Sequence, residues 1–544
     1  MKDSFRQSMA WLHTWTGLVV GWVLYFVFMT GAAGYFDEEI TLWMQPEAPA
    51  VTSAAELPAA DIVARAQALL QKSAPGAERW SLDPSWDRVG HDWYLSWSGA
   101  GQEQGSVAID PVTGQPRSPL RLRETEGGVG LYRLHYQLHY MSEHSAILIV
   151  GACTMLMLLA ILSGVVTHKK IFKDFFTFRP GKGQRSWLDM HNLVSVTALP
   201  FFLMITYSGL IFFMYAYMPA AMDVAYGRNT AWPDDGYSNP LNPRANNRFD
   251  DEDMPKVRPI VHVAGNSVAP LTDIARLARI VERQWGQGKI GGISVEHPGR
   301  SDAHVTFLFM DTGLVYSSRK QMVFDGVTGR DLSPPSFRQG AAWKVQNGMI
   351  ALHEGLFAGP LLRWLYFLSG LLGCAMIATG LILWTVKRRQ KQQRGEGDAF
   401  SFRLVETLNI GTIAGLPLGI AGYFWANRLL PVGMEARAAW EFHALFGTMG
   451  AAFLWAAVRH PAGKAWTELS ATAAAGFLLL PLLNAVTTDR HLGNTIRGGE
   501  WVLASFDLTM LAVGAVFAMA AIKVHRRWAA PSTSDRRRLA GGSA

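Results

Sequence analysis

Histidines at the start of long apolar segments are the residues of this sequence whose type and spacing could do chemistry. The chain has 544 residues, 15 of them histidines. His13 and His191 open two apolar segments, while His139 and His353 open two others, with His135 one helical turn before His139. A single histidine at such a place is more often an interfacial residue. A set at matching positions, where an ionisable group is costly, predicts ligands.

Haem ligation is the chemistry that suits these histidines. A bare metal site would need carboxylate or thiolate ligands, which the apolar segments hardly supply. Haem iron needs only one imidazole from each of two facing helices, because the macrocycle fills the plane. Cys153 and Cys374 form no C-x-x-C-H motif, so the haem would be held without a covalent bond. Two histidine pairs, one near each membrane face, predict two haems and a path for electrons.

The elements that must carry these histidines are membrane spans. The composition is 49% hydrophobic and 17% charged, and several apolar blocks reach the roughly 20 residues that cross a bilayer. The fold class is therefore a polytopic α-helical membrane protein in contact with membrane lipid. Eight spans are predicted, at residues 14–35, 145–167, 190–217, 361–385, 408–427, 440–458, 470–488 and 501–523. The first is expected to be a retained anchor, because it is long for the apolar region of a signal peptide.

Glycines within the spans, among them Gly164, Gly209 and Gly380, would let a flat cofactor or a neighbouring helix approach closely. Helix packing alone would also explain them.

Basic clusters indicate the orientation of the spans. The stretches HKKIFKDFFTFRPGKGQRS, KRRQKQQR and KVHRRW follow the second, fourth and last spans, so all fall on one side. Lys and Arg in short loops favour the cytoplasmic side, and we therefore expect both termini in the cytoplasm. The net charge of +7 comes from these clusters, so no nucleic-acid partner is expected.

Two long polar segments, 36–135 and 218–350, are predicted to fold as domains outside the cytoplasm. Each has a helix-like stretch, LPAADIVARAQALLQ or LTDIARLARIVERQW, followed by alternating strands. Each ends in an apolar strand, an Asp and a V-T-G turn, in VAIDPVTGQPRS and MVFDGVTGRDLS. We infer a duplicated α+β module within a larger repeat of helix, external domain and helix.

The predicted domains follow in chain order. They are a first span (1–35), a first external module (36–135), the second and third spans with a basic cytoplasmic loop (136–217), a second external module (218–350), a fourth span (351–390), a cytoplasmic linker (391–403), a block of four spans (404–525) and a basic cytoplasmic tail (526–544).

Several motifs resemble the PepSY-associated transmembrane helix family. They are WLHTWTGLVVGW, the LHY before the second span, HKKIFKDFFTFRPGKGQRSWLDMHN and the D-P-V-T-G and D-G-V-T-G endings, and they fall within residues 1–390. Members include iron-regulated inner-membrane proteins and ferric-siderophore reductases of Gram-negative bacteria. The resemblance implies haem b, two PepSY modules in the periplasm, and electron delivery to the ferric iron of a periplasmic siderophore complex.

The resemblance also implies which histidines hold haem. His13 and His191 would ligate the cytoplasmic-side haem, and His139 and His353 the periplasmic-side haem. His135 competes with His139, because both rings lie on one helix face. The four spans after residue 404 depart from the shorter reductases of the family.

The predicted function is a haem-containing inner-membrane reductase that moves electrons across the membrane to a ferric siderophore, with no acid-base or nucleophilic catalyst. The chain lacks a G-x-G-x-x-G unit, and its cytoplasmic loops are too short for a flavin or nicotinamide domain. The electron donor would then be a separate cytoplasmic protein or a quinol. Two alternatives are a non-enzymatic, membrane-anchored PepSY binding module and a metal-chelate transport component. Transport is disfavoured because the spans hold few acidic residues.

Overall fold

The computed structural model describes residues 4–49, 56–85, 88–89, 92–99, 104–117, 122–168, 178–217, 267–310, 321–333, 341–393 and 399–529. The chain divides into two compact units. The helical unit comprises Met1–Ala48, Leu122–Leu210 and Pro360–Ala544, and the sheet-containing unit comprises Pro49–Arg121 and Ile211–Gly359.

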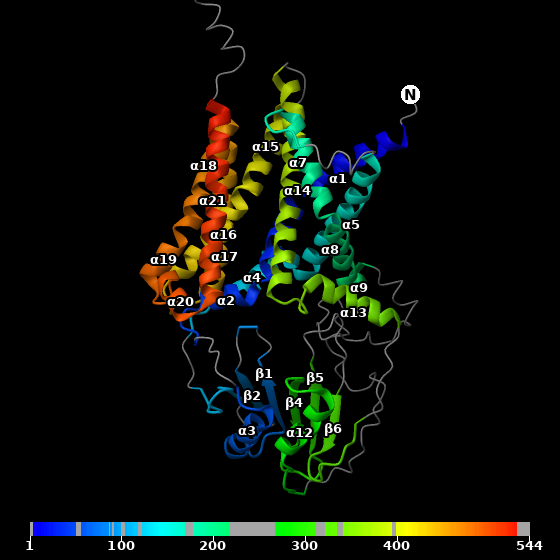
Figure 1. Ribbon diagram of the computed structural model, residues 1–544, viewed down its shortest axis with the longest axis vertical. Helices are drawn as coiled ribbons and strands as arrows, with labels where there is room; N and C mark the ends of the chain where they lie inside the picture. The colour runs from blue at the N-terminus through cyan, green and yellow to red at the C-terminus, as the bar shows by residue number, and fades with distance from the viewer. Residues whose placement is uncertain are drawn as a thin grey trace, which may run out of the picture. The chain divides into compact units, whose positions relative to one another are not determined.

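The helical unit contains every helix of the described residues that is long and apolar enough to cross a membrane by itself (Figure 1). Its first part has α1 (Phe5–Gly34), α2 (Asp37–Met44), α4 (Gly127–Gln137), α5 (Glu143–Thr167), α7 (Gln184–Thr197), α8 (Leu199–Phe212) and α14 (Pro360–Gln393). Its C-terminal part has α15 (Ala399–Ile413), α16 (Gly415–Leu429), α17 (Arg437–Val458), α18 (Ala462–Leu478), α19 (Leu480–Thr487), α20 (Leu492–Gly498) and α21 (Trp501–Ala529).

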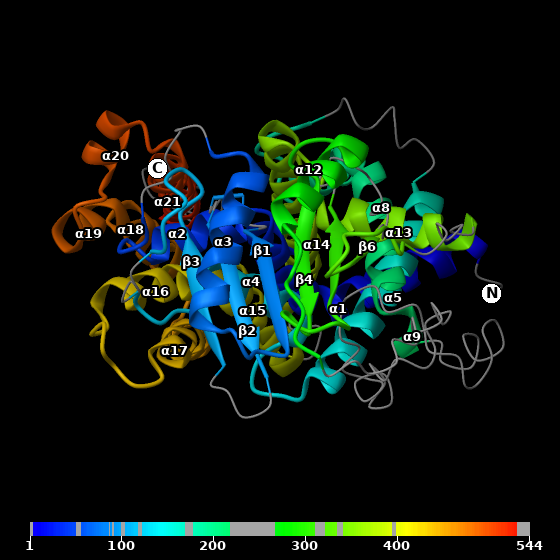
Figure 2. The ribbon, with the colours of Figure 1, turned by 90° about the horizontal axis from the view of Figure 1, so that it is seen from below.

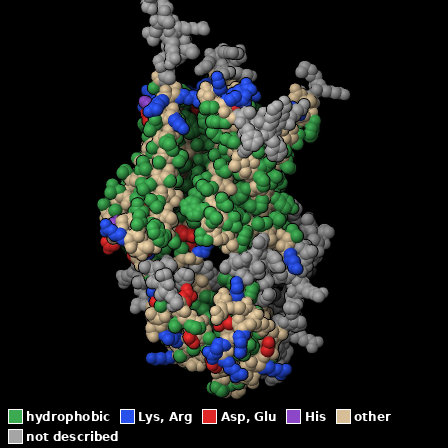
Figure 3. Space-filling model, in the orientation of Figure 1, with side chains coloured by type: hydrophobic (Ala, Val, Ile, Leu, Met, Phe, Trp, Pro, Cys, Tyr) green, Lys and Arg blue, Asp and Glu red, His purple; other side chains and the backbone are tan. Residues whose placement is uncertain are grey.

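Seven of the eight predicted spans fall on helices of this unit, and the third, 190–217, begins on α7 and α8 and extends into the other unit, which starts at Ile211. Among the described residues, seven helices are long and apolar enough to cross a membrane, and the bent pair of α7 and α8 makes eight if it counts as one span. Figure 3 shows hydrophobic side chains covering the unit between its ends, and Lys and Arg gathered where α14 and α21 finish. At that end the Arg388 guanidinium lies 3.7 Å from the centre of the Trp384 ring. The protein is therefore a multi-pass membrane protein, as the composition predicts.

The third predicted span, 190–217, is not one straight helix. Its two halves, α7 and α8, meet at a bend of 66°. Pro200 lies in the first turn of α8 and has no N–H to donate to the carbonyl of Val196, one turn earlier. Its ring also crowds that carbonyl, so the helix is interrupted there.

A second proline shows how the unit satisfies a backbone group inside the membrane. Pro417 in α16 leaves the carbonyl of Ile413 without its helical donor. The hydroxyl of Tyr25, from α1, donates to that carbonyl at 3.2 Å. Because no water competes at this depth, such a bond ties α1 to the C-terminal helices.

The sheet-containing unit has six antiparallel strands in the order β3-β2-β1-β4-β5-β6 (Figure 2). The strands are β1 (Arg79–Pro84), β2 (Trp93–Ser98), β3 (Gly105–Ile109), β4 (Ile290–Glu296), β5 (His304–Phe309) and β6 (Gln321–Asp325). The helices α3 (Ala59–Ser73) and α12 (Ile274–Trp285) pack against its buried face, and α9 (Met214–Tyr217) and α13 (Ala341–Glu354) complete the unit. Each half thus supplies one helix and three strands in the same order, as the predicted duplication requires.

The two modules form one continuous sheet because β1 pairs with β4, with Ser81 opposite Ser294. The sequence analysis did not identify β1 as a strand. Trp80 and Leu82 of β1 point into the buried core with Val295 of β4, while Ser81 lies on the other face. The strand is short and ends at Pro84, so its local pattern is weak, and its central place depends on pairing with the second module.

The two V-T-G endings adopt the same turn. The Asp110 carboxylate accepts from the backbone N–H of Val112 at 2.8 Å, and the Asp325 carboxylate accepts from that of Val327 at 2.9 Å. Both turns close with a glycine of positive φ, Gly114 and Gly329. Asp at the start and glycine in the left-handed region are what such a turn needs.

Candidate functional site

His13 on α1 lies against α5. Its ring Nδ1 is 2.8 Å from the carbonyl oxygen of Ala160. A carbonyl can only accept, so Nδ1 carries the hydrogen and Nε2 of the neutral ring keeps its lone pair. The ring also packs on Gly164, where an added Cβ would lie 3.0 Å from Cε1.

His191 on α7 lies in the same way against α14. Its Nδ1 is 3.0 Å from the carbonyl oxygen of Met376 and 3.2 Å from the hydroxyl of Thr379. An added Cβ on Gly380 would lie 3.2 Å from Cε1 of the ring. Nδ1 is again the donor, and Nε2 is available.

His135 on α4 lies against α1. Its Nδ1 donates to the carbonyl oxygen of Val27 at 2.7 Å. An added Cβ on Gly31 would lie only 2.5 Å from Nδ1, so this is the tightest of the three approaches. Burial lowers the pKa of His135, although the bond to Val27 opposes the shift. Burial therefore favours the neutral ring, which is the form that binds metals.

The three histidines share one local arrangement on the facing helix. In each case the accepting carbonyl belongs to the residue four positions before the glycine. A buried Ser or Thr precedes each glycine, and its hydroxyl bonds back to a carbonyl of its own helix. The three dipeptides are Thr30–Gly31, Ser163–Gly164 and Thr379–Gly380. The hydroxyl donates its hydrogen bond within its own helix and so needs no other acceptor, and the glycine leaves room for the imidazole.

A fourth dipeptide of this kind, Ser208–Gly209, lies on α8. Ser208 is buried and its hydroxyl bonds to the carbonyl of Met204 at 2.7 Å. Gly209 follows His191 by the same 18 residues that separate Gly31 from His13. By the internal repeat, Gly209 corresponds to Gly31. Gly164, Gly209 and Gly380 were predicted from the sequence to allow close approach, whereas Gly31 was missed. The recurring Ser/Thr–Gly dipeptide would have indicated all four glycines.

His353 is the predicted histidine that corresponds to His135 in the second repeat. It lies near the end of α13, in the sheet-containing unit, where its ring centre is 5.9 Å from that of Phe212. The pairing of His353 with a histidine of the helical unit stays a prediction.

His139 differs from these histidines. It follows the end of α4 with a backbone φ of 25°, between Leu138 and Tyr140, which also have positive φ. Its ring stacks on Phe446 with centres 5.4 Å apart and planes 5° from parallel. Among the described residues, its ring makes no bond to a backbone carbonyl of the kind that the other three share. The prediction that His135 and His139 lie on one helix face is wrong, because α4 ends at Gln137, and the structure places only His135 of these two candidates in the shared arrangement.

The rings of His13 and His191 have centres 6.2 Å apart, with planes at 59°. Metal–nitrogen bonds are roughly 2 Å long, so two rings this close could both bind one metal ion. In the described part of the chain, no cluster of three or more His, Cys, Asp or Glu side chains could hold a bare metal ion. The donor set fits a haem better than a protein-only metal site.

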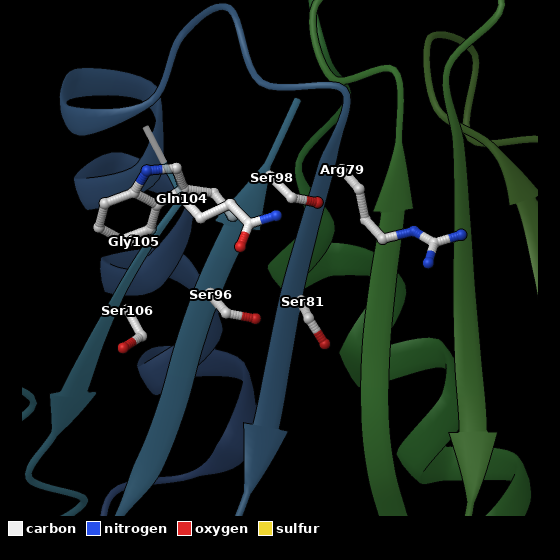
Figure 4. Close-up of a pocket in the computed structure, with 8 residues that line it drawn as sticks. Arg79, Ser81, Ser96, Ser98, Gln104, Gly105 and Ser106 are labelled. Carbon is white, nitrogen blue, oxygen red and sulfur yellow. The ribbon is translucent and has the colours of Figure 1, made fainter. Parts of the chain in front are cut away.

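A second feature lies on the sheet, away from its hydrophobic core. A depression of about 430 Å³ is lined by Arg79, Ser81, Ser96, Trp97, Ser98, Gln104, Gly105 and Ser106. Figure 4 shows the serine hydroxyls of three neighbouring strands side by side on this face. Strand pairing puts Ser106, Ser96 and Ser81 directly opposite one another in a row. The surface offers serine hydroxyls beside one charged lining residue, Arg79, and the Ser81 hydroxyl donates to the Asp83 carboxylate at 2.6 Å.

These features define a polytopic membrane protein with an α+β unit and histidines fixed at the helix contacts. The model of the PepSY-associated TM region matches residues 10–387, more than half of the chain. The protein belongs to this family. No curated protein gives a significant match. The C-terminal helices from α15 onward lie outside the matched residues.

Proposed function

We propose that the protein is a haem-containing membrane reductase that passes electrons across the membrane to ferric iron in a siderophore complex. The observation that carries this proposal is the shared arrangement of His13, His191 and His135. Each ring donates through Nδ1 to a backbone carbonyl and leaves Nε2 for a metal. Ligand histidines in metalloproteins are fixed by this kind of second hydrogen bond.

His13 and His191 would hold one haem. His135 would hold the second, with His353 as the expected partner by the internal repeat. Haem bound in this way supplies a one-electron couple whose potential depends on axial ligands and their hydrogen bonds. The carbonyls of Ala160, Met376 and Val27 fix each ring and its tautomer, and the adjacent glycines allow the rings to lie against the helix.

The direction of electron flow follows from the expected topology. The basic ends of α14 and α21 support a cytoplasmic location for that face by the positive-inside rule. The sheet-containing unit would then lie in the periplasm of a bacterial inner membrane, where siderophores are met. Reduction would release the iron because hard oxygen ligands hold Fe(III) far better than Fe(II). The donor would be a separate cytoplasmic protein or a quinol.

The test is an optical spectrum of the purified full-length protein, oxidised and dithionite-reduced, with haem quantified per chain. We expect a b-type spectrum near two haems per chain. Replacing His13, His191, His135 or His353 by Ala should each remove about one haem, whereas His139→Ala and the exposed control His144→Ala should keep both. Two single-haem variants whose remaining spectra differ would show two distinct sites. A colourless protein after expression with ample haem would refute the proposal.

A membrane-anchored binding module is the second candidate, favoured by the hydroxyl-lined depression on the sheet. Ser81, Ser96 and Ser106 would contact an oxygen-rich ligand, and the helices would act as an anchor. This function predicts normal ligand binding in the histidine variants and its loss in Ser96→Leu, which fills the middle of the row. Isothermal titration with ferric and iron-free hydroxamate chelates separates the candidates, because only the reductase also needs haem to turn the ferric chelate over.

A further inference from the structure

Buried charged groups join the C-terminal helices to the segment that leads into α4. The carbonyl of Asn427, near the end of α16, accepts from the Arg123 guanidinium at 2.8 Å and also from Arg437. Two cations at this carbonyl match the negative end of the helix dipole. Arg123 is itself paired with Glu47 at 2.6 Å.

Arg437 and Glu441 form the centre of this network and are both fully buried. One carboxylate oxygen of Glu441 accepts from Arg437 at 2.5 Å and from the side chain of Asn427 at 2.7 Å. The other accepts from the hydroxyl of Thr125 at 2.5 Å. Removing one partner of a buried ion pair leaves an uncompensated charge, so the pair fixes its surroundings firmly.

The chain is held at successive residues just before α4. Arg123 and Thr125 are bonded as described, and the carbonyl of Glu124 accepts from Arg437 at 2.7 Å. The hydroxyl of Tyr423, on α16, donates to the carbonyl of Gly127, the first residue of α4, at 2.8 Å.

Two glycines in the first turn of α4 also approach neighbouring helices closely. An added Cβ on Gly128 would lie 2.1 Å from the carbonyl oxygen of Asp37 on α2, and one on Gly130 would lie 2.8 Å from the ring of Phe442 on α17. α4 can therefore neither rotate nor slide without moving α2 or α17. About two helical turns further on, α4 carries His135, whose approach to Gly31 is the tightest of the three.

We infer that the C-terminal helices act as a clamp on α4 and thereby position His135. Thr125, Tyr423 and the Arg437–Glu441 pair are positioning residues, because they touch the entry to α4 and not the imidazole. The clamp itself rests on the contacts above. Its consequence for metal ligation rests on the proposed function.

The experiment uses the full-length protein with the double substitution Thr125→Val and Tyr423→Phe. Both changes keep side-chain shape and leave the Arg437–Glu441 pair intact. The matched control is Glu468→Gln, which removes a half-buried ion pair with Arg459 in the same C-terminal helices. Hydrogen exchange reports on the clamp without any cofactor, and redox titration reports on the ligand.

We expect amide exchange in residues 127–137 to rise roughly tenfold in the double variant, because the variant loses the hydrogen bonds that Thr125 and Tyr423 make at the start of α4. Only one of two haem potentials should shift, the one that His135→Ala also abolishes. Glu468→Gln should change neither the amide exchange in residues 127–137 nor the two haem potentials. Unchanged exchange in 127–137 would overturn the clamp. Faster exchange with both potentials unchanged would overturn the positioning of His135, while the histidine variants test the proposed function separately.

Discussion

The rings of His13 and His191 lie 6.2 Å apart, centre to centre, while each hydrogen-bonds to a different helix, α5 or α14. Four helices therefore meet at one pair of imidazoles. Because each Nδ1 atom bonds to a carbonyl of a neighbouring helix, neither ring is free to turn.

Adding a methyl group at the glycines should disturb the histidines in a graded way. Alanine usually stabilises a helix relative to glycine, by about 1 kcal/mol. Gly31→Ala should instead lower the melting temperature and the haem content, because its Cβ would lie 2.5 Å from His135 Nδ1. Gly164→Ala and Gly380→Ala should act less strongly, at 3.0 and 3.2 Å from their rings.

The control for this series is Gly17→Ala. Gly17 lies on α1, as Gly31 does, and an added Cβ there meets no atom within 4 Å. It should leave haem content unchanged and keep or raise the melting temperature. Equal changes in haem content and melting temperature for Gly17→Ala and Gly31→Ala would show that the close contact between Gly31 and His135 is not needed for either property.

The internal repeat predicts that Gly209→Ala acts through His353. Gly209 occupies the position in the second repeat that Gly31 has in the first, 18 residues after a span-opening histidine. We expect the spectrum of Gly209→Ala to resemble that of His353→Ala, with the His13 and His191 site intact. A spectrum like that of His13→Ala would contradict the correspondence.

The bond from Tyr25 to Ile413 should depend on Pro417. Tyr25→Phe removes the donor to a carbonyl that the proline leaves free, and should cost about 1 kcal/mol of unfolding free energy. In a Pro417→Ala background the new N–H of residue 417 can reach that carbonyl, so the same change should cost close to nothing. A double-mutant cycle by denaturant titration in detergent measures the difference. If the effects of Tyr25→Phe and Pro417→Ala on the unfolding free energy simply add, the Tyr25 hydroxyl does not compensate for the donor that Pro417 lacks.

The duplicated turns should respond alike. Asp110→Ala and Asp325→Ala each remove two backbone hydrogen bonds to the carboxylate. Each should destabilise the sheet-containing unit by about 1 kcal/mol, and Asn at either position should recover most of the loss because its side-chain oxygen still accepts. Thermal unfolding followed by strand-specific hydrogen exchange measures both. A large effect at one turn only would mean that the two halves of the sheet are not equivalent.

The sequence alone determined the features that depend on local pattern. Apolar blocks identified the spans, and the Asp and V-T-G signals identified the turns at Gly114 and Gly329. His13 and His191 were predicted to lie together because each opens a span at the same place in a repeat. These properties follow from chain periodicity and from residue-specific backbone preferences, so they need no knowledge of distant contacts.

The tertiary structure decided what depends on contacts between distant segments. β1 became a central strand only through its pairing with β4 of the other module. His135 and His139 are one turn apart in sequence, and only the carbonyl of Val27, on another helix, distinguishes them. The sequence predicts the C-terminal helices only as four spans. The structure shows that Arg437 and Glu441 on these helices hydrogen-bond to the segment before α4. A side chain's partner across a helix interface is set by packing of the whole unit, which no local pattern encodes.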